Sequence, residues 1–202
     1  MKPHEYIPLA LRTASGDYMA IRSRIQNVCT VDLLHAALGM SSESAEVIEI
    51  SSISKVQYWD DKTTQDVLAE LGDCCWYLNL ACSCIAKEFG LSSFYVFPVN
   101  DAFSSNLVFN QGTSSMTISS GVFCDIIKAH LFYGKSLNTK FADKTLEAYY
   151  AGIVLCCSAL NTTLETVLEK NIAKLTTRYG DTFSEKRALI RDLKKEEIAY
   201  SK

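Results

Sequence analysis

Two short acidic stretches, each set in an apolar sequence, constrain this chain more than any other feature. Glu43 and Glu46 lie three residues apart, and so do Glu70 and Asp73. On a helix such a pair shares one face, and an unpaired carboxylate in apolar surroundings is costly or takes up a proton. Four carboxylates on two facing helices repel one another unless a cation lies between them, and oxygen ligands suit Mg²⁺, which also binds water and phosphate. The sequence therefore predicts a metal–phosphate site inside a helical bundle.

Composition limits the classes of protein that can carry such a site. The 202 residues are 48% hydrophobic and 21% charged, which is ordinary for a soluble globular domain. The net charge of −3 argues against nucleic-acid binding through bulk charge. The most apolar run, Cys74–Ala86, is too short to span a bilayer, and Met1–Tyr6 lacks the apolar core of a signal peptide. We therefore expect a cytoplasmic protein without a nucleic-acid or membrane partner.

The eight cysteines need a separate explanation. Their spacing gives no pair of Cys-x-x-Cys motifs, and the chain has only three histidines. We interpret the cysteines as small buried hydrophobic residues in helices. A zinc or disulfide role is the alternative.

Helical periodicity dominates the rest of the chain, and strand signals are sparse, so we predict an all-α helical bundle. The expected helices cover residues 5–13, 18–27, 33–50, 64–88, 122–131, 139–160, 163–179 and 184–200. Residues 92–120 are rich in Ser, Asn and Gly, and we expect a long connecting loop there with extended pieces at 95–97 and 107–109. The predicted organisation is a single domain over 1–202, with a metal-binding half (1–91), this loop (92–120) and a second half (121–202).

Several motifs together resemble those of the all-α nucleoside triphosphate pyrophosphohydrolases, the MazG-like superfamily that includes dimeric dUTPases and dCTP pyrophosphatases. They are Leu34–Gly39, Glu-x-x-Glu at 43–46, Glu-x-x-Asp at 70–73 and the tail Glu169–Tyr179. The resemblance implies a hydrolase that cleaves a (d)NTP to the (d)NMP and pyrophosphate with Mg²⁺, or Mn²⁺ in its place. The chain departs from the family pattern at Ser42, where a further Glu is usual, and at Gly180, where Pro is common.

The resemblance also implies roles for the acidic residues. Glu43, Glu46, Glu70 and Asp73 would bind the metal, and Glu46, with Glu43, is the catalytic candidate that orients or deprotonates the attacking water. On the pattern alone, these carboxylates could equally form solvated helix faces.

A second group of residues is expected to contact the nucleotide. Lys174 and Arg178 lie four residues apart on one helical face and would hold phosphate oxygens. The resemblance gives Asn171 contact with the sugar or base and places Tyr77 against the deoxyribose, with Tyr179 in the same group. The alternatives are a solvated basic face and core packing. Trp59 and Trp76 are candidates for base stacking, although packing in the core or between lobes is the preferred interpretation of both. Arg12, Lys128 and Lys135 are candidates of lower rank for phosphate.

The second half resembles a degenerate copy of the first, which predicts a tandem pair of helical hairpins. The positions equivalent to the four acids then read Ser119, Val122, Tyr149 and Gly152, which cannot hold a metal. Such a chain would mimic the facing lobes of a homodimer, as a pseudo-dimeric monomer; a homodimer or higher homo-oligomer is the other expectation. Two functional alternatives to the enzyme stay open, a catalytically inactive nucleotide-binding regulatory module, suggested by Ser42, and a structural helical adaptor.

Overall fold

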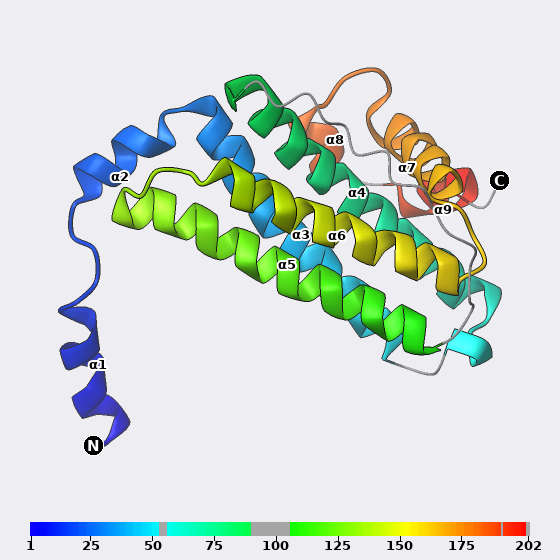
Figure 1. Cartoon of the computed structure of the whole chain (residues 1–202). Helices are drawn as coiled ribbons and strands as arrows, with labels where there is room; N and C mark the ends of the chain where they lie inside the picture. Colours follow the sequence, from blue (N-terminus) through cyan, green and yellow to red (C-terminus); the bar gives the residue numbers. More distant parts are fainter. Residues whose placement is uncertain (53–55, 90–105, 191, 201–202) are drawn as a thin grey trace.

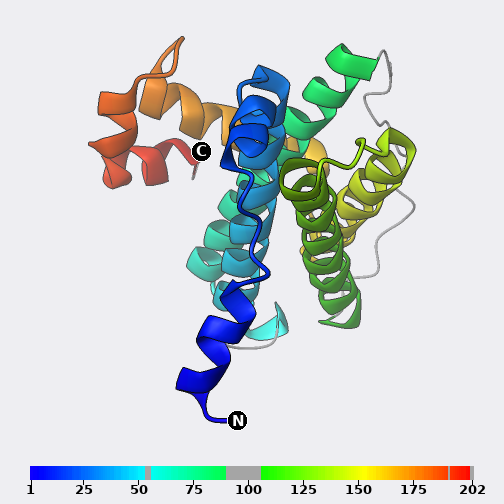
Figure 2. The ribbon, with the colours of Figure 1, turned by 90° about the vertical axis from the view of Figure 1, so that its left-hand side faces the viewer.

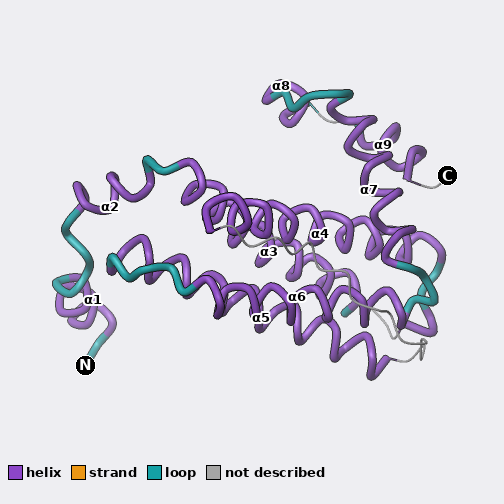
Figure 3. Tube along the Cα trace, turned by 45° about the horizontal axis from the view of Figure 1, so that its top comes forward, coloured by secondary structure: helices purple, strands orange, loops and turns teal. Residues whose placement is uncertain are grey.

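The computed structural model describes residues 1–52, 56–89, 106–190 and 192–200, and every regular element in these ranges is a helix (Figures 1 and 3). The all-α prediction is therefore confirmed. The elements are α1 (Pro3–Leu11), α2 (Tyr18–Ile25), α3 (Val28–Ser51), the 3₁₀ turn η1 (Val56–Tyr58), α4 (Asp61–Phe89), α5 (Asn106–Tyr133), α6 (Thr139–Ala159), α7 (Leu164–Tyr179), α8 (Glu185–Leu189) and α9 (Leu193–Tyr200).

Two long helical hairpins form the body of the molecule. Helices α3 and α4 pack on each other, as do α5 and α6, and the hairpins meet through α3 against α5 and α4 against α6. Figure 2 shows that α7, α8 and α9 lie on the other side of the α3–α4 layer from α5 and α6. Helix α1 has no buried residue and extends away from this body (Figure 1). The α3–α4 layer is thus covered on two sides, by a second hairpin and by the C-terminal helices.

Buried residues recur at alternating spacings of three and four along each long helix, as expected for a bundle with coiled-coil-like packing. On α4 the buried stripe runs through Val67, Leu71, Cys74, Leu78, Ala81 and Ile85, and Leu68, Cys75 and Cys84 beside it are also buried. On α3 the stripe runs through Leu33, Ala37, Met40, Ser44 and Val47, with Thr30, Ala36 and Gly39 also buried. Glu43, Glu46, Glu70 and Asp73 lie beside these buried stripes. The two helices therefore bury their apolar faces in the bundle and present carboxylates at its edge.

The predicted connecting loop is wrong for residues 106–120, because α5 begins at Asn106. The piece expected to be extended at 107–109 is helical, and the one at 95–97 lies outside the described residues. Tight packing on α6 accounts for this helix. A Cβ atom on Gly112 would lie 2.7 Å from the carbonyl oxygen of Gly152, and Ser115 Oγ donates a hydrogen bond to the Ala148 carbonyl at 2.8 Å. Small residues that indicate a loop in isolation therefore allow a close helix crossing.

The C-terminal prediction is correct for one helix and wrong for the next. Helix α7 begins after Thr163, whose side chain accepts a hydrogen bond from the Thr166 backbone N–H at 3.1 Å, and it ends before Gly180, as predicted. The single helix expected at 184–200 is instead two short helices, α8 and α9.

The four positions of the proposed degenerate copy carry no carboxylate, and three of them, Ser119, Tyr149 and Gly152, are buried between the helices. Tyr149 has a structural role. Its hydroxyl lies 3.1 Å from the Met40 carbonyl and 3.0 Å from Ser44 Oγ, both on α3. This polar contact joins the two hairpins in the middle of the apolar core.

Replacing Tyr149 with Phe is expected to reduce the free energy of unfolding by about 1–2 kcal/mol, because it leaves the Met40 carbonyl and the Ser44 hydroxyl without this partner. Urea denaturation measures the change. Tyr133→Phe, at a side chain on α5 that is 64% exposed, is the control and should change stability by less than about 0.5 kcal/mol. Equal stability of the two variants would contradict this role.

Candidate functional site

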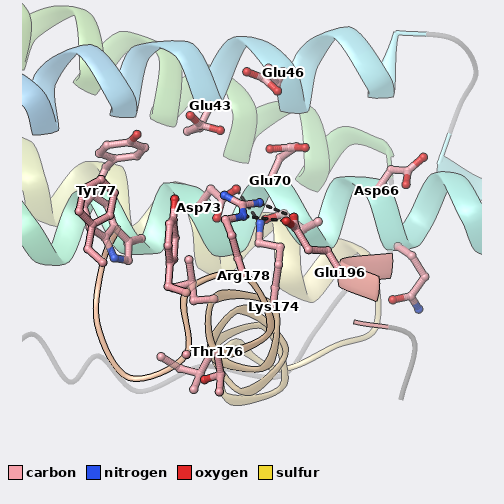
Figure 4. A pocket seen from close by; sticks show the side chains of 18 of the residues that line it. Glu43, Glu46, Asp66, Glu70, Asp73, Tyr77, Lys174, Thr176, Arg178 and Glu196 are labelled. Carbon is pink, nitrogen blue, oxygen red and sulfur yellow. Dashed lines mark hydrogen bonds and ion pairs between the residues drawn. The ribbon is translucent and has the colours of Figure 1, made fainter. Parts of the chain in front are cut away.

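Three carboxylates converge at the edge of the α3–α4 hairpin. Glu43 and Glu46 on α3 and Glu70 on α4 each place one carboxylate oxygen within 4.8 Å of the others (Figure 4). The three-residue spacing puts the first two on one face of α3, and α4 passes that face at Glu70. Glu46 is exposed, and the other two are half-buried. Three hard oxygen donors at this separation could hold a divalent cation such as Mg²⁺ or Mn²⁺.

Mutual repulsion and burial disfavour ionisation of this cluster. Burial, reinforced by the charge of Asp73, raises the pKa of Glu70 to about 8, although the positive charge of Lys174 opposes the rise. Burial also raises the pKa of Glu43, followed by the charges of Glu46 and Asp73. Without a cation, the pKa of Glu70 therefore lies above neutral pH, and that of Glu43 lies above its ordinary value. A divalent cation would relieve the repulsion and displace the proton that Glu70 holds.

Asp73 lies beside the cluster, but cationic and amide side chains of α7 occupy its carboxylate. Lys174 Nζ is 2.6 Å from Asp73 Oδ2, and Asn171 Nδ2 donates to Oδ1 at 2.8 Å. Asn171, predicted to contact the sugar or base, is buried against α4 and positions Asp73. Gly72 permits this approach, since a Cβ atom there would lie 2.8 Å from Asn171 Nδ2. Asp73 is thus brought to the site, in contact with Lys174 and Asn171 and outside the three-carboxylate cluster.

Arg178, predicted to hold phosphate, forms an ion pair with Glu196, which was not among the predicted site residues. Its Nε and Nη2 atoms lie 3.0 Å from Glu196 Oε1 and 2.6 Å from Oε2, respectively. Both side chains are nearly buried, with exposed fractions of 12% for Arg178 and 6% for Glu196. Burial lowers the pKa of Arg178, but the hydrogen bonds that its guanidinium donates to Glu196 and its hydrogen bond with Tyr179 outweigh burial, so the pKa rises above its usual value. The guanidinium is therefore held in a fixed orientation at the wall of the site (Figure 4).

Aromatic rings lie at the same site. Tyr77 rests on the backbone of α3 at Gly39, where a Cβ atom would be 2.3 Å from the ring, so this position accepts only glycine without displacing Tyr77. Its ring packs edge-on against Trp76, with centroids 4.9 Å apart. On the α7 side, Tyr179 packs against Phe183 at a centroid distance of 5.3 Å. These rings provide flat apolar surfaces on which a planar group could stack.

One pocket of about 1310 Å³ is lined by the carboxylates, cations and aromatic rings described above, but not by Asn171, and is large enough for a nucleotide. The α3 and α4 walls contribute Glu43, Glu46, Asp61, Lys62, Gln65, Asp66, Ala69, Glu70, Asp73, Trp76 and Tyr77. The C-terminal segments contribute Ile172, Lys174, Leu175, Thr176, Arg178, Tyr179, Gly180, Asp181, Thr182, Phe183 and Glu196.

Other candidates lie elsewhere. Trp59 packs edge-on against Phe109 at 5.2 Å and does not line the pocket, which agrees with the core contact preferred for it over base stacking. Lys128 forms an exposed ion pair with Asp125, and neither Arg12 nor Lys135 lines the pocket. The eight cysteines, all in described segments, are unpaired thiols, and five are buried, in agreement with their interpretation as core residues.

The protonated cluster predicts an unusual pH dependence of stability. The folded protein retains a proton on Glu70 up to about pH 8, whereas the unfolded chain releases it near its ordinary value of 4.5. Between these values the folded state binds more protons, so stability decreases as pH rises. The Tm of metal-free protein, measured in EDTA, should therefore fall from pH 5 to pH 8.5, and Glu70→Gln should make the decline smaller. An equal decline in both proteins would contradict the assignment.

Two further findings concern the whole chain. In the segments that the structure describes, no helix alone has the length and apolar composition to cross a bilayer; α6 and α7 meet that test only as a pair bent by 98°. Comparison with protein-family models, curated proteins and solved structures finds no match for this chain.

Proposed function

We propose that this protein is a Mg²⁺-dependent nucleoside triphosphate pyrophosphohydrolase of the MazG-like all-α type, which cleaves a (d)NTP to the (d)NMP and pyrophosphate. The observation that carries the proposal is the convergence of Glu43, Glu46 and Glu70 opposite Lys174 and Arg178 in one pocket. Anionic metal ligands on one wall and cations on the other match the needs of a metal–triphosphate complex.

The carboxylates suit the cation that this chemistry requires. Glu43, Glu46 and Glu70 would hold Mg²⁺ or Mn²⁺, which when bound supplies charge neutralisation and acidifies a water ligand. Among the three, Glu46 is the exposed carboxylate and the candidate to accept the proton of the attacking water, with Glu43 as its neighbour. Asp73, held by Lys174 and Asn171, would complete the negative wall.

The opposite wall and the aromatic rings would position the substrate. Lys174 and Arg178 are the groups for the phosphate oxygens, and Trp76, which is 41% exposed, and Tyr77 offer surfaces for the nucleoside. Positioning and charge neutralisation account for most of the rate enhancement in phosphoryl chemistry. The pocket therefore favours a nucleotide over a simple polyphosphate.

A nucleotide panel tests the proposal. The protein is incubated with each of the common NTPs and dNTPs in Mg²⁺, and pyrophosphate and monophosphate are quantified, with EDTA as the control. At least one nucleotide should give equal amounts of both products, and EDTA should abolish release. Release of orthophosphate with the diphosphate, or no release from any nucleotide, would contradict the proposed reaction.

A catalytically inactive nucleotide-binding module is the second candidate, favoured by Ser42. Ser42 stands where the family pattern has a further Glu. Its hydroxyl lies 3.1 Å from the Gly39 carbonyl oxygen and 3.3 Å from Glu43 Oε1. A module of this kind would show a higher Tm with Mg²⁺ and nucleotide, because binding stabilises the folded state, but no product in the panel above.

A further inference from the structure

The three cations that line the described pocket, Lys62, Lys174 and Arg178, are all paired with carboxylates. The pocket wall carries eight acidic side chains against these three. Lys62 pairs with Asp66 at 3.2 Å, Lys174 with Asp73 at 2.6 Å and Arg178 with Glu196 at 2.6 Å. A polyphosphate therefore competes with a carboxylate at each of these cations, and it can take the two-point contact of Arg178 through Nε and Nη2 only by displacing Glu196.

The three pairs differ in what their separation would do to the protein. Lys62 and Asp66 lie on the same helix and are exposed, so that their separation leaves the fold unchanged. Lys174 and Asp73 join α7 to α4, and Asn171 supports their contact. Glu196 alone comes from a short terminal helix, α9, which packs on α7. Of the three pairs, only separation of Arg178 from Glu196 would therefore release a separate helix, α9.

Helix α9 is held in a way that suits release. Among the α9 side chains that the structure describes, Glu196 is buried and Ile198 is 60% exposed, while Lys195 pairs with Asp192 in solvent. Figure 4 shows the Glu196 carboxylate directed at the Arg178 guanidinium, beside Lys174 and Asp73. A helix of eight residues that packs on α7 belongs to the less stable parts of a fold.

We infer that α9 is an autoinhibitory latch, in which Glu196 occupies Arg178 and is displaced when a phosphate group binds that guanidinium. Phosphate can replace the carboxylate because each of these anions presents two oxygens that accept hydrogen bonds from the arginine guanidinium. The inference rests on the proposed function only in taking the pocket as a polyphosphate site. It adds a regulatory contact that raises the concentration of substrate needed for binding.

The test compares Glu196→Gln with Glu185→Gln, an identical chemical change at an exposed carboxylate on α8 that does not line the pocket. Calorimetric titration with inorganic tripolyphosphate in Mg²⁺ should show about tenfold tighter binding by Glu196→Gln than by wild type, since the variant removes a competing charge-assisted contact. Glu185→Gln should bind as wild type does. Equal affinities for all three proteins would overturn the latch.

Hydrogen exchange on the wild-type chain gives a readout that needs no variant. With Mg²⁺ and tripolyphosphate, backbone amides of α9 should exchange faster, while those of α4 around Glu70 become protected. Slower exchange in α9 would overturn the latch, because that helix would then close over the ligand. Tighter tripolyphosphate binding by Glu196→Gln without hydrolysis of any nucleotide would retain the latch and refute the enzyme; hydrolysis with equal affinities would do the reverse.

Discussion

Replacing Glu70 with Gln is expected to lower the turnover of the nucleotide substrate by roughly 10²- to 10³-fold, the range found when one charge-stabilising group is removed from an active site. The carboxylate lies in the three-acid cluster, and the amide cannot supply an anionic ligand to the cation. The fold should survive, because the side chain already holds a proton in the metal-free protein below about pH 8. Initial rates at saturating Mg²⁺, together with the Tm in EDTA at pH 7, measure both effects.

Glu49→Gln is the matched control for this experiment. Glu49 lies on α3, one turn beyond Glu46, but is exposed and does not line the pocket. Its replacement should leave turnover within about twofold of wild type, because a surface charge at that distance is screened by solvent and salt. Unchanged turnover in Glu70→Gln, or an equal loss in both variants, would remove the cluster from the mechanism.

A large effect on stability is also expected from Gly152→Ala at the crossing of α5 and α6. The new Cβ atom would lie 2.7 Å from the Gly112 carbonyl oxygen and 3.0 Å from the Met116 backbone nitrogen, and neither can move without shifting a helix. Overpacking of this kind costs about 2–3 kcal/mol, more than the gain of about 1 kcal/mol from the helix propensity of alanine. Chemical denaturation should therefore show a net loss of about 1–2 kcal/mol.

Gly121→Ala, on one helix of the same pair, should raise the stability that Gly152→Ala lowers. Gly121 lies within α5, and a Cβ atom there meets nothing within 4 Å. Alanine should raise the free energy of unfolding by about 0.5–1 kcal/mol, because it only reduces the flexibility of the unfolded chain and favours the helix. Destabilisation by Gly121→Ala, or stabilisation by Gly152→Ala, would contradict the close crossing of α5 and α6.

Local spacing predicted three of the four acids of the expected cluster, but it did not predict that Asp73 pairs with Lys174 and Asn171 instead. The interval between Glu43 and Glu46 predicts a shared helical face, and the structure places Glu70 against that face. The partner of Asp73 is Lys174, 101 residues further along the chain, and no local pattern connects the two. Glu196 sits in a run of charged residues that resembles a solvated helix, so its contact with Arg178 also depended on tertiary structure.

The first half of α5 was missed for a related reason. Its buried positions include Gly112, Thr113, Ser119 and Ser120, which have low helix propensity and interrupt the apolar periodicity that sequence analysis relies on. Packing against α6 overrides these local preferences, since small residues let the two backbones approach closely. The first hairpin has a regular apolar stripe on α4 and was therefore predictable, whereas the second depends on a fit between two helices.

Anomalous diffraction from crystals grown with Mn²⁺ and a non-hydrolysable dNTP analogue tests the central claim most directly. The account predicts a manganese peak within coordination distance of carboxylate oxygens from Glu43, Glu46 and Glu70, with the analogue's phosphates between the metal and Lys174. Manganese found only at exposed acids away from this cluster, with the nucleotide absent from the pocket, would contradict it.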